Sequence, residues 1–123
     1  MKYVVTGGAG FIGSNLVNKL VSQEHEVHVI DNFISGKKEN CNKKAIYYNL
    51  DLSKQSNFKK IKNIFRNADT VFHLACIARV QPSIKNPIDY EMNNTISTVI
   101  LLKACVDTKV RRFIYSSSSS VYG

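Results

Sequence analysis

Three glycines near the amino terminus have the spacing of a phosphate-binding turn. Gly7, Gly10 and Gly13 follow a β-branched run that ends at Thr6, and an apolar helical pattern begins with Phe11. Gly7 allows a sharp turn off the strand, and Gly10 has no Cβ to hold a phosphate away from the backbone. Gly13 lets the first helical turn lie close to the sheet, with the free N–H groups of that helix facing an anion. Such a turn predicts a diphosphate-binding site.

An acid follows this turn at the distance expected of a ribose-binding residue. Residues 26–30 are predicted to form a second strand, and it leads to Asp31, 18 residues beyond Gly13. Dinucleotide sites place this acid about 20 residues beyond the glycines. Asp31 would accept hydrogen bonds from both adenosine ribose hydroxyls and would repel a 2′-phosphate, so the pattern predicts NAD rather than NADP. The alternative is that Asp31 is an ordinary turn residue at a strand end.

Length and composition indicate one domain with an ordinary core. The chain has 123 residues, of which 44% are apolar. It contains neither an apolar leader segment nor a run of about 18 apolar residues, so we expect a cytoplasmic protein with no membrane partner. The cysteines, Cys41, Cys76 and Cys105, are odd in number and unclustered, which favours neither a disulfide framework nor a metal site. Cys76 and Cys105 are expected to be small core residues.

The net charge of +8 raises the question of a nucleic-acid partner. The lysines between residues 37 and 62 are spread out and have neither interleaved stacking aromatics nor a recognition motif. They therefore favour solvated faces, and we expect no nucleic-acid binding. Part of the positive charge could also help to attract an anionic nucleotide.

Strand and helix patterns alternate along the chain. We expect strands at residues 3–6, 26–30, 45–49, 70–74 and 112–117. We expect helices from Phe11 to about residues 22–25, after Ser53 as N-cap, and from about Ile88 to Thr108, the last preceded by a loop carrying Arg79, Pro82 and Pro87. The alternation predicts an α/β fold of the Rossmann type, a doubly wound parallel sheet of order 3-2-1-4-5 in three αβα layers.

Five segments carry motifs in a consistent order. They read TGGAGFIG at residues 6–13, DNFISG at 31–36, HLA at 73–75, NNTIST at 93–98 and SSSSSVYG at 116–123. Together they resemble the extended short-chain dehydrogenase/reductase family and, within it, the nucleotide-sugar epimerases of the UDP-glucose 4-epimerase type. Each motif alone has modest specificity, but the similarity runs through the whole chain.

The resemblance implies a bound NAD and assigns residues to its parts. The diphosphate would lie over Gly7, Gly10, Phe11, Ile12 and Gly13, the adenosine ribose would meet Asp31 and Asn32, and Asp51 and Leu52 would hold the adenine ring. Leu74, Ala75 and Ala78 match the loop that passes under the cofactor, and Asn93 matches the helix residue that faces it. Simpler alternatives make Asp51 a turn acid and Asn93 a surface residue. His73, on an apolar strand, is expected to be a core histidine with satisfied hydrogen bonds.

The resemblance also implies a catalytic role for Ser118, four residues before Tyr122 and just beyond the fifth strand. In the family this hydroxyl binds the sugar oxygen that loses its proton to a tyrosine, while hydride passes to NAD. The keto sugar then rotates and takes the hydride back on its other face. Ser117 and Ser119 remain alternatives to Ser118, as does a merely solvated hydroxyl in a serine-rich turn.

The departures from the family pattern bear on activity. No tyrosine of the chain is followed four residues later by lysine, and the sequence stops at Gly123 within a family motif. We therefore expect residues 1–123 to be the NAD-binding part of a longer enzyme, truncated after the fifth strand, which lacks the sugar-nucleotide-binding part and is inactive alone. Ser97 replaces a common glycine, and Ala78 replaces a lysine found in some epimerases, for which Arg79 could compensate.

Several functions remain open within this interpretation. Ser119 and Ser120 occupy places where related dehydratases carry an Asp-Glu pair, which favours an epimerase over a dehydratase. Reductases and decarboxylases of the family differ beyond residue 123, and a non-catalytic NAD-binding module is the other class. The expected substrate is a nucleotide sugar, most simply a UDP-sugar, and the resemblance implies a homodimer of the full-length protein through helices such as that at residues 88–108.

Overall fold

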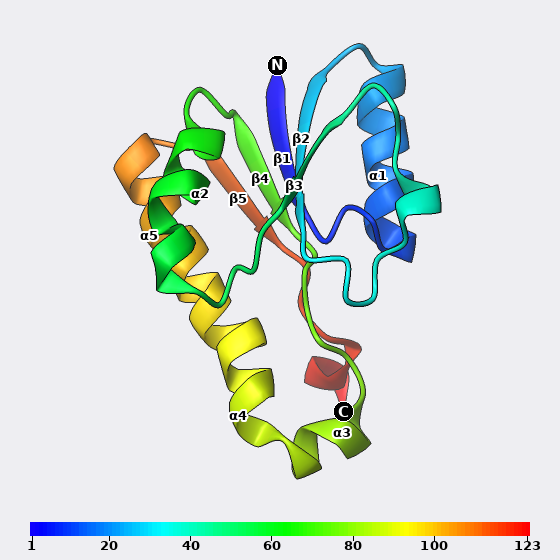
Figure 1. Ribbon diagram of the computed structural model, residues 1–123, viewed down its shortest axis with the longest axis vertical. Coiled ribbons are helices and arrows are strands. Elements are labelled where there is room, and N and C mark those ends of the chain that lie inside the picture. The colour runs from blue at the N-terminus through cyan, green and yellow to red at the C-terminus, as the bar shows by residue number, and fades with distance from the viewer.

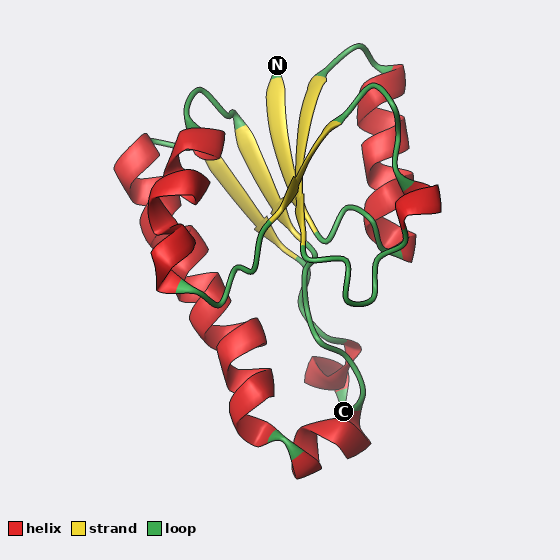
Figure 2. Cartoon of the chain, viewed as in Figure 1, coloured by secondary structure: helices red, strands yellow, loops and turns green.

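The computed structural model describes residues 1–123 and shows a five-stranded parallel sheet of order β3-β2-β1-β4-β5. Every neighbouring pair of strands is parallel. The strands are β1 Lys2–Thr6, β2 Glu26–Asp31, β3 Ile46–Asn49, β4 Thr70–His73 and β5 Arg112–Tyr115. Helices cover both faces of the sheet (Figures 1 and 2), so the predicted order and the three layers are confirmed.

The helices occupy both sides of the sheet because its central strands are apolar on both faces. On one face, α1 (Phe11–Ser22) contributes Val17 to a cluster that also includes Val5 and Val29 of the sheet. On the other face, α2 (Phe58–Phe65) and α5 (Ser97–Thr108) enclose a larger cluster around Val4, Phe65 and Leu101 (Figure 1).

The predicted helix at residues 88–108 is present, but its middle turn is wider than an α-helix. The whole helical segment comprises α4 (Pro87–Tyr90), a π-helical turn (Glu91–Ile96) and α5. Before it, the residues expected to form a loop include a short helix, α3 (Val80–Lys85). Short 3-10 turns complete the structure at Lys38–Asn40, Gln55–Asn57 and Ser119–Tyr122.

Two local predictions were wrong. Ser53 does not cap α2, because its amide and hydroxyl both donate to Oδ1 of Asp51, forming a tight turn before the 3-10 turn that leads into the helix. Cys76 is exposed, whereas Cys105 is buried as predicted. Burial raises the pKa of the Cys105 thiol to about 11, which keeps it protonated.

The carboxyl ends of the parallel strands meet at one edge of the sheet, and the loops that leave them lie together there (Figure 1). Such an edge is where open α/β sheets bind ligands. None of the helices combines the length and the apolar composition needed to cross a bilayer.

Candidate functional site

The glycine turn between β1 and α1 has the shape that the sequence predicted. Gly7 has φ +72°, and its amide donates to the carbonyl of Ile30 at 2.9 Å, which ties the turn to β2. A Cβ on Gly13 would lie 2.1 Å from the Gly7 oxygen, so only glycine fits there. A Cβ on Gly10 would meet only that oxygen, at 3.3 Å, and would otherwise project into open space. Gly10 therefore keeps a space clear, whereas Gly13 allows close packing.

The Asp31 carboxylate is fixed against this turn. Its Oδ2 accepts a hydrogen bond from the amide of Ala9 at 2.9 Å, and its Oδ1 accepts from the amide of Phe33 at 2.8 Å. The residue is only 8% exposed, at the end of β2. Because each carboxylate oxygen has a second lone pair, both can still accept a hydrogen bond from a ligand hydroxyl.

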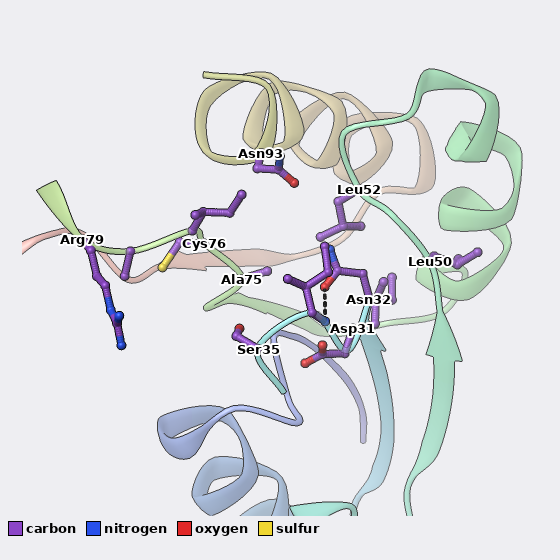
Figure 3. Close-up of a pocket in the computed structure, with 13 residues that line it drawn as sticks. Asp31, Asn32, Ser35, Leu50, Leu52, Ala75, Cys76, Arg79 and Asn93 are labelled. Carbon is purple, nitrogen blue, oxygen red and sulfur yellow. Dashed lines mark hydrogen bonds between the residues drawn. The ribbon is translucent and has the colours of Figure 1, made fainter. Parts of the chain in front are cut away.

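A cavity of about 420 Å³ opens beside Asp31 at the sheet edge (Figure 3). Its lining is mostly apolar with a few polar groups, which is typical of a small-molecule site. It brings together six of the predicted site residues: Asp31, Asn32, Leu52, Ala75, Ala78 and Asn93. Seven further residues complete the lining: Ile30, Ile34, Ser35, Leu50, Cys76, Ile77 and Arg79.

Asn93 presents a hydrogen-bond acceptor to this cavity. Its Nδ2 donates to the backbone carbonyl of Asp89 at 2.8 Å, and because a carbonyl can only accept, this bond fixes the orientation of the amide. The Oδ1 atom is then free on the cavity side of the helix (Figure 3). A ligand hydroxyl is a suitable donor for it.

The wall formed by residues 75–79 is held by the helix that carries Asn93. Asn94 contacts both backbone groups of Ile77: the Ile77 amide donates to Oδ1 at 2.8 Å, and Nδ2 donates to the Ile77 carbonyl at 3.0 Å. The Tyr90 hydroxyl donates to the carbonyl of Ala78 at 2.8 Å. The wall is thus held in place by side chains that come 12 to 17 residues later in the sequence.

Ser97, at a position where the resemblance leads us to expect glycine, has a defined place beside the π-helical turn. It is 1% exposed, and its hydroxyl donates to the carbonyl of Asn93. The buried hydroxyl is therefore satisfied, and a serine is compatible with this packing.

Asp31 and Arg79 are the two charged residues of the lining, and they lie well apart in Figure 3. Arg79 makes none of the ion pairs of the structure. Its backbone has φ +89° and ψ +133°, a region that side chains rarely adopt. The guanidinium is therefore available to a ligand, and the backbone beneath it is strained.

The other predicted site residues lie outside the cavity lining. Leu74 packs with the apolar cluster under α1, and Asp51 bonds Ser53 in the turn described above. Phe11 and Ile12, at the start of α1, are 84% and 66% exposed. Ser118 is exposed, and its hydroxyl oxygen accepts from the amide of Ser120 at 3.1 Å.

His73 is a satisfied core histidine, as predicted. It is 2% exposed and bonds the hydroxyls of Thr6 and Thr98, on either side of the ring. Burial lowers the pKa of His73 from 6.5 to about 4, so the imidazole is neutral at pH 7.

The fold and the cavity define a doubly wound α/β protein of the Rossmann type with a cavity at the carboxyl ends of its strands. The profile of the NAD dependent epimerase/dehydratase family matches residues 3–123, so the chain belongs to that family. The predicted family is therefore confirmed.

Relatives with similar sequences are longer than this chain. It is 35% identical to the UDP-glucose 4-epimerase of Yersinia enterocolitica, over all of this chain and 38% of the relative. It is 37% identical to UDP-glucuronic acid decarboxylase 1 of Arabidopsis thaliana, over all of this chain and 27% of the relative. The chain thus spans less than two fifths of the length of these relatives.

Solved structures agree with this assignment. The UDP-glucose 4-epimerase of Thermotoga maritima, solved with UDP-glucose, superposes with a TM-score of 0.92 at 38% identity, over all of this chain and 40% of that one. The UDP-glucose 4-epimerase of Thermus thermophilus, solved as a complex with NAD, superposes with a TM-score of 0.87 at 34% identity, over 96% of this chain and 38% of that one.

Proposed function

We propose that this chain is the NAD-binding part of a nucleotide-sugar 4-epimerase that acts on UDP-sugars. The observation that carries the proposal is the position of Asp31, bonded to the amide of Ala9 and lining the cavity at the end of β2. This placement lets one carboxylate meet a ribose beside a turn that can hold a diphosphate. Membership of an NAD-dependent family supports NAD as the dinucleotide.

The residues of the site suit the parts of NAD. The diphosphate would lie over the glycine turn, where Gly10 leaves space and the start of α1 carries no acidic residue that would repel it. Asp31 would accept from the adenosine ribose, and the apolar side chains of Leu50 and Leu52 offer a surface for the adenine. Asn93 would accept from the second ribose through Oδ1. When bound, NAD supplies an acceptor and donor of hydride.

Ser118 is proposed as the hydroxyl that binds the reacting sugar oxygen. It follows β5, and its exposed hydroxyl can still donate, because its bond to Ser120 uses it only as an acceptor. The tyrosine and lysine that complete this chemistry in the family have no counterpart pair among residues 1–123. We therefore propose that this chain alone binds the cofactor without turning over a sugar, and that the sugar-binding part belongs to a longer protein.

The second candidate is a nucleotide-sugar decarboxylase. It is favoured by the 37% identity to the Arabidopsis decarboxylase, beside 35% to the Yersinia epimerase. The two functions share the hydride transfer to NAD and differ in the later fate of the oxidised sugar, so residues of the cofactor site do not discriminate between them.

Two experiments test the proposal. Calorimetric titration of the 123-residue chain is expected to show NAD binding and at least about tenfold weaker NADP binding, because Asp31 repels a 2′-phosphate. No NAD binding, or equal binding of NADP, would contradict it. The full-length gene product, supplied with NAD, is expected to interconvert UDP-glucose and UDP-galactose. Carbon dioxide release from UDP-glucuronic acid without that interconversion would favour the decarboxylase.

A further inference from the structure

Thr6, the last residue of β1, makes three side-chain hydrogen bonds through one oxygen. Its Oγ1 lies 2.7 Å from Nδ1 of His73 and 3.2 Å from each of the amides of Leu74 and Ala75. Both amides can only donate, so they occupy the two lone pairs of the hydroxyl. The hydroxyl proton must then point at Nδ1 of His73, which has to be an unprotonated acceptor.

The other side of the imidazole agrees with this assignment. A neutral histidine whose Nδ1 accepts carries its proton on Nε2, and Nε2 lies 2.9 Å from Oγ1 of Thr98. The Thr98 hydroxyl donates its own proton to the carbonyl of Asn94 at 2.6 Å. Each hydroxyl and imidazole proton in this chain of bonds meets an acceptor, and no buried side-chain polar atom of the structure is left without a partner. Thr6 therefore donates to His73, His73 donates to Thr98, and Thr98 donates to the π-helical turn. We call this series of hydrogen bonds the relay.

The two amides held by Thr6 form the junction between the glycine turn and the wall of the cavity. The Ala75 amide nitrogen lies so close to Gly7 that a Cβ on Gly7 would be 2.8 Å from it. Ala75 itself lines the cavity. The Leu74 amide has a second acceptor in the carbonyl of Thr6, but the only acceptor of the Ala75 amide is the Thr6 hydroxyl. The position of Ala75 against the turn thus depends on which way that hydroxyl points.

We propose that His73 is a positioning residue for the NAD site: by accepting the Thr6 hydroxyl proton, it leaves the oxygen of Thr6 to hold Ala75 against the glycine turn. This inference rests on the proposed function for its effect on NAD, but the arrangement of protons does not. The residue acts through Thr6 and makes no contact with the ligand.

Two substitutions of His73 separate this role from simple packing. In asparagine Oδ1 is attached to Cγ, as Nδ1 is in histidine, so His73→Asn can still accept from Thr6. The side-chain amide of glutamine lies one atom further from the backbone, at the position of Nε2 in histidine. His73→Gln therefore keeps a hydrogen-bond partner for Thr98 but leaves Thr6 without one. We expect the Kd for NAD to stay within about twofold of the unsubstituted chain in His73→Asn and to rise about tenfold in His73→Gln.

A packing role predicts the opposite order, because asparagine is smaller and leaves the larger void. The inference is overturned if His73→Gln binds NAD as the unsubstituted chain does, or if His73→Asn loses as much affinity as His73→Gln. Urea unfolding of each variant, followed in parallel, shows that the compared chains are folded.

Two measurements without NAD test the proton arrangement directly. In nitrogen-15 NMR spectra at about pH 7, Nε2 of His73 is expected to carry the proton and Nδ1 to lack it, and a protonated Nδ1 would overturn the relay. Hydrogen exchange of the Ala75 amide is expected to be faster in His73→Gln than in His73→Asn, and equal rates would also overturn it. An unsubstituted chain that binds no NAD contradicts the proposed function, whereas these two measurements still decide the inference.

Discussion

The carboxylate of Asp31 accepts a hydrogen bond from the backbone amide of Ala9, 22 residues earlier in the chain, at 2.9 Å. Asp31, at the end of β2, therefore stabilises the glycine turn and also lines the cavity. A second bond, from the amide of Phe33, uses the other oxygen. One side chain thus shapes the turn and places a negative charge in the lining of the cavity.

Asp31→Asn is expected to lower both the stability of the fold and its preference for NAD. The asparagine side chain has one acceptor oxygen and one NH2 group, so one of the two backbone amides would face a donor. The lost bond should cost about 1–3 kcal/mol in the free energy of unfolding, measured in urea. Without the negative charge, a 2′-phosphate is repelled less, and the ratio of NADP to NAD affinity in calorimetric titrations should rise.

Asp69→Asn is the matched control for Asp31→Asn. It removes the same charge just before β4, at the opposite edge of the sheet, where Asp69 pairs with Arg111. It should leave the ratio of NADP to NAD affinity unchanged. An equal change of that ratio in both variants would show that net charge, and not the position of Asp31, sets the preference.

Alanine substitutions in the glycine turn are expected to separate folding from cofactor binding. In Gly13→Ala the new Cβ would lie 2.1 Å from the Gly7 oxygen, so the turn must shift. We expect a loss of about 3 kcal/mol in the free energy of unfolding, at the upper end of what overpacking costs. Circular dichroism during urea unfolding measures this loss.

Gly10→Ala is the matched partner, because Gly10 has an extended backbone that alanine adopts freely (φ −79°, ψ 177°). Its Cβ meets only the Gly7 oxygen, at 3.3 Å, so the stability should fall by no more than about 1 kcal/mol, the cost of alanine at a helix N-cap. The Cβ enters the space proposed for the diphosphate, so NAD affinity should fall clearly. Unchanged affinity in Gly10→Ala would place the diphosphate elsewhere.

His73 is expected to make the stability of the chain depend on pH. Burial lowers the pKa of His73 from 6.5 to about 4. Above pH 6.5 the imidazole is neutral in both the folded and the unfolded chain, so it adds no pH dependence. Between pH 6.5 and 4 only the unfolded chain takes up the proton, and the free energy of unfolding should therefore fall as the pH falls, by roughly 3 kcal/mol in all.

The contribution of His73 is measured as a difference, because carboxylates also titrate in acid. Urea unfolding of the unsubstituted chain and of His73→Gln is compared at intervals from about pH 7 to about pH 4. The gap between the two curves should change by the amount expected for His73, since glutamine does not titrate. Parallel curves would show that His73 takes up its proton equally in both states.

The sheet could be predicted because its signals are local, whereas most of the predicted lining residues came from the family resemblance. Three of the four residues 27–30 are apolar and β-branched, and buried parallel strands favour this composition on both faces. Their alternation with helices then favoured right-handed βαβ units and a doubly wound sheet. Asp31 was found from its spacing beyond the glycines, and Ala75 was found from the family resemblance. Both follow a strand closely, so they line the same edge of the sheet.

The remaining features depend on contacts that have no local pattern. Serine is a residue type favoured at helix N-caps, but the amide and the hydroxyl of Ser53 both donate to Asp51, two residues earlier. Cys76 is exposed in the cavity wall, next to Ile77, whose backbone is bonded by Asn94, 17 residues later in the sequence. The π-helical turn at Glu91–Ile96 is stabilised by Ser97 and by Thr98, whose hydroxyls bond carbonyls within it, and a repeat of apolar residues does not reveal such bonds.

Arg79→Gly is expected to stabilise the fold. The φ of +89° at Arg79 places the Cβ against its own backbone, and glycine removes that strain. We expect the free energy of unfolding to rise by about 1 kcal/mol, the relief of strain less the added freedom of glycine in the unfolded chain. Arg79→Ala is the control, since it removes the same guanidinium but keeps the Cβ, and it should bring no such gain. If Arg79→Ala stabilises the chain as much as Arg79→Gly does, the destabilisation at this position comes from the arginine side chain beyond Cβ and not from the backbone conformation.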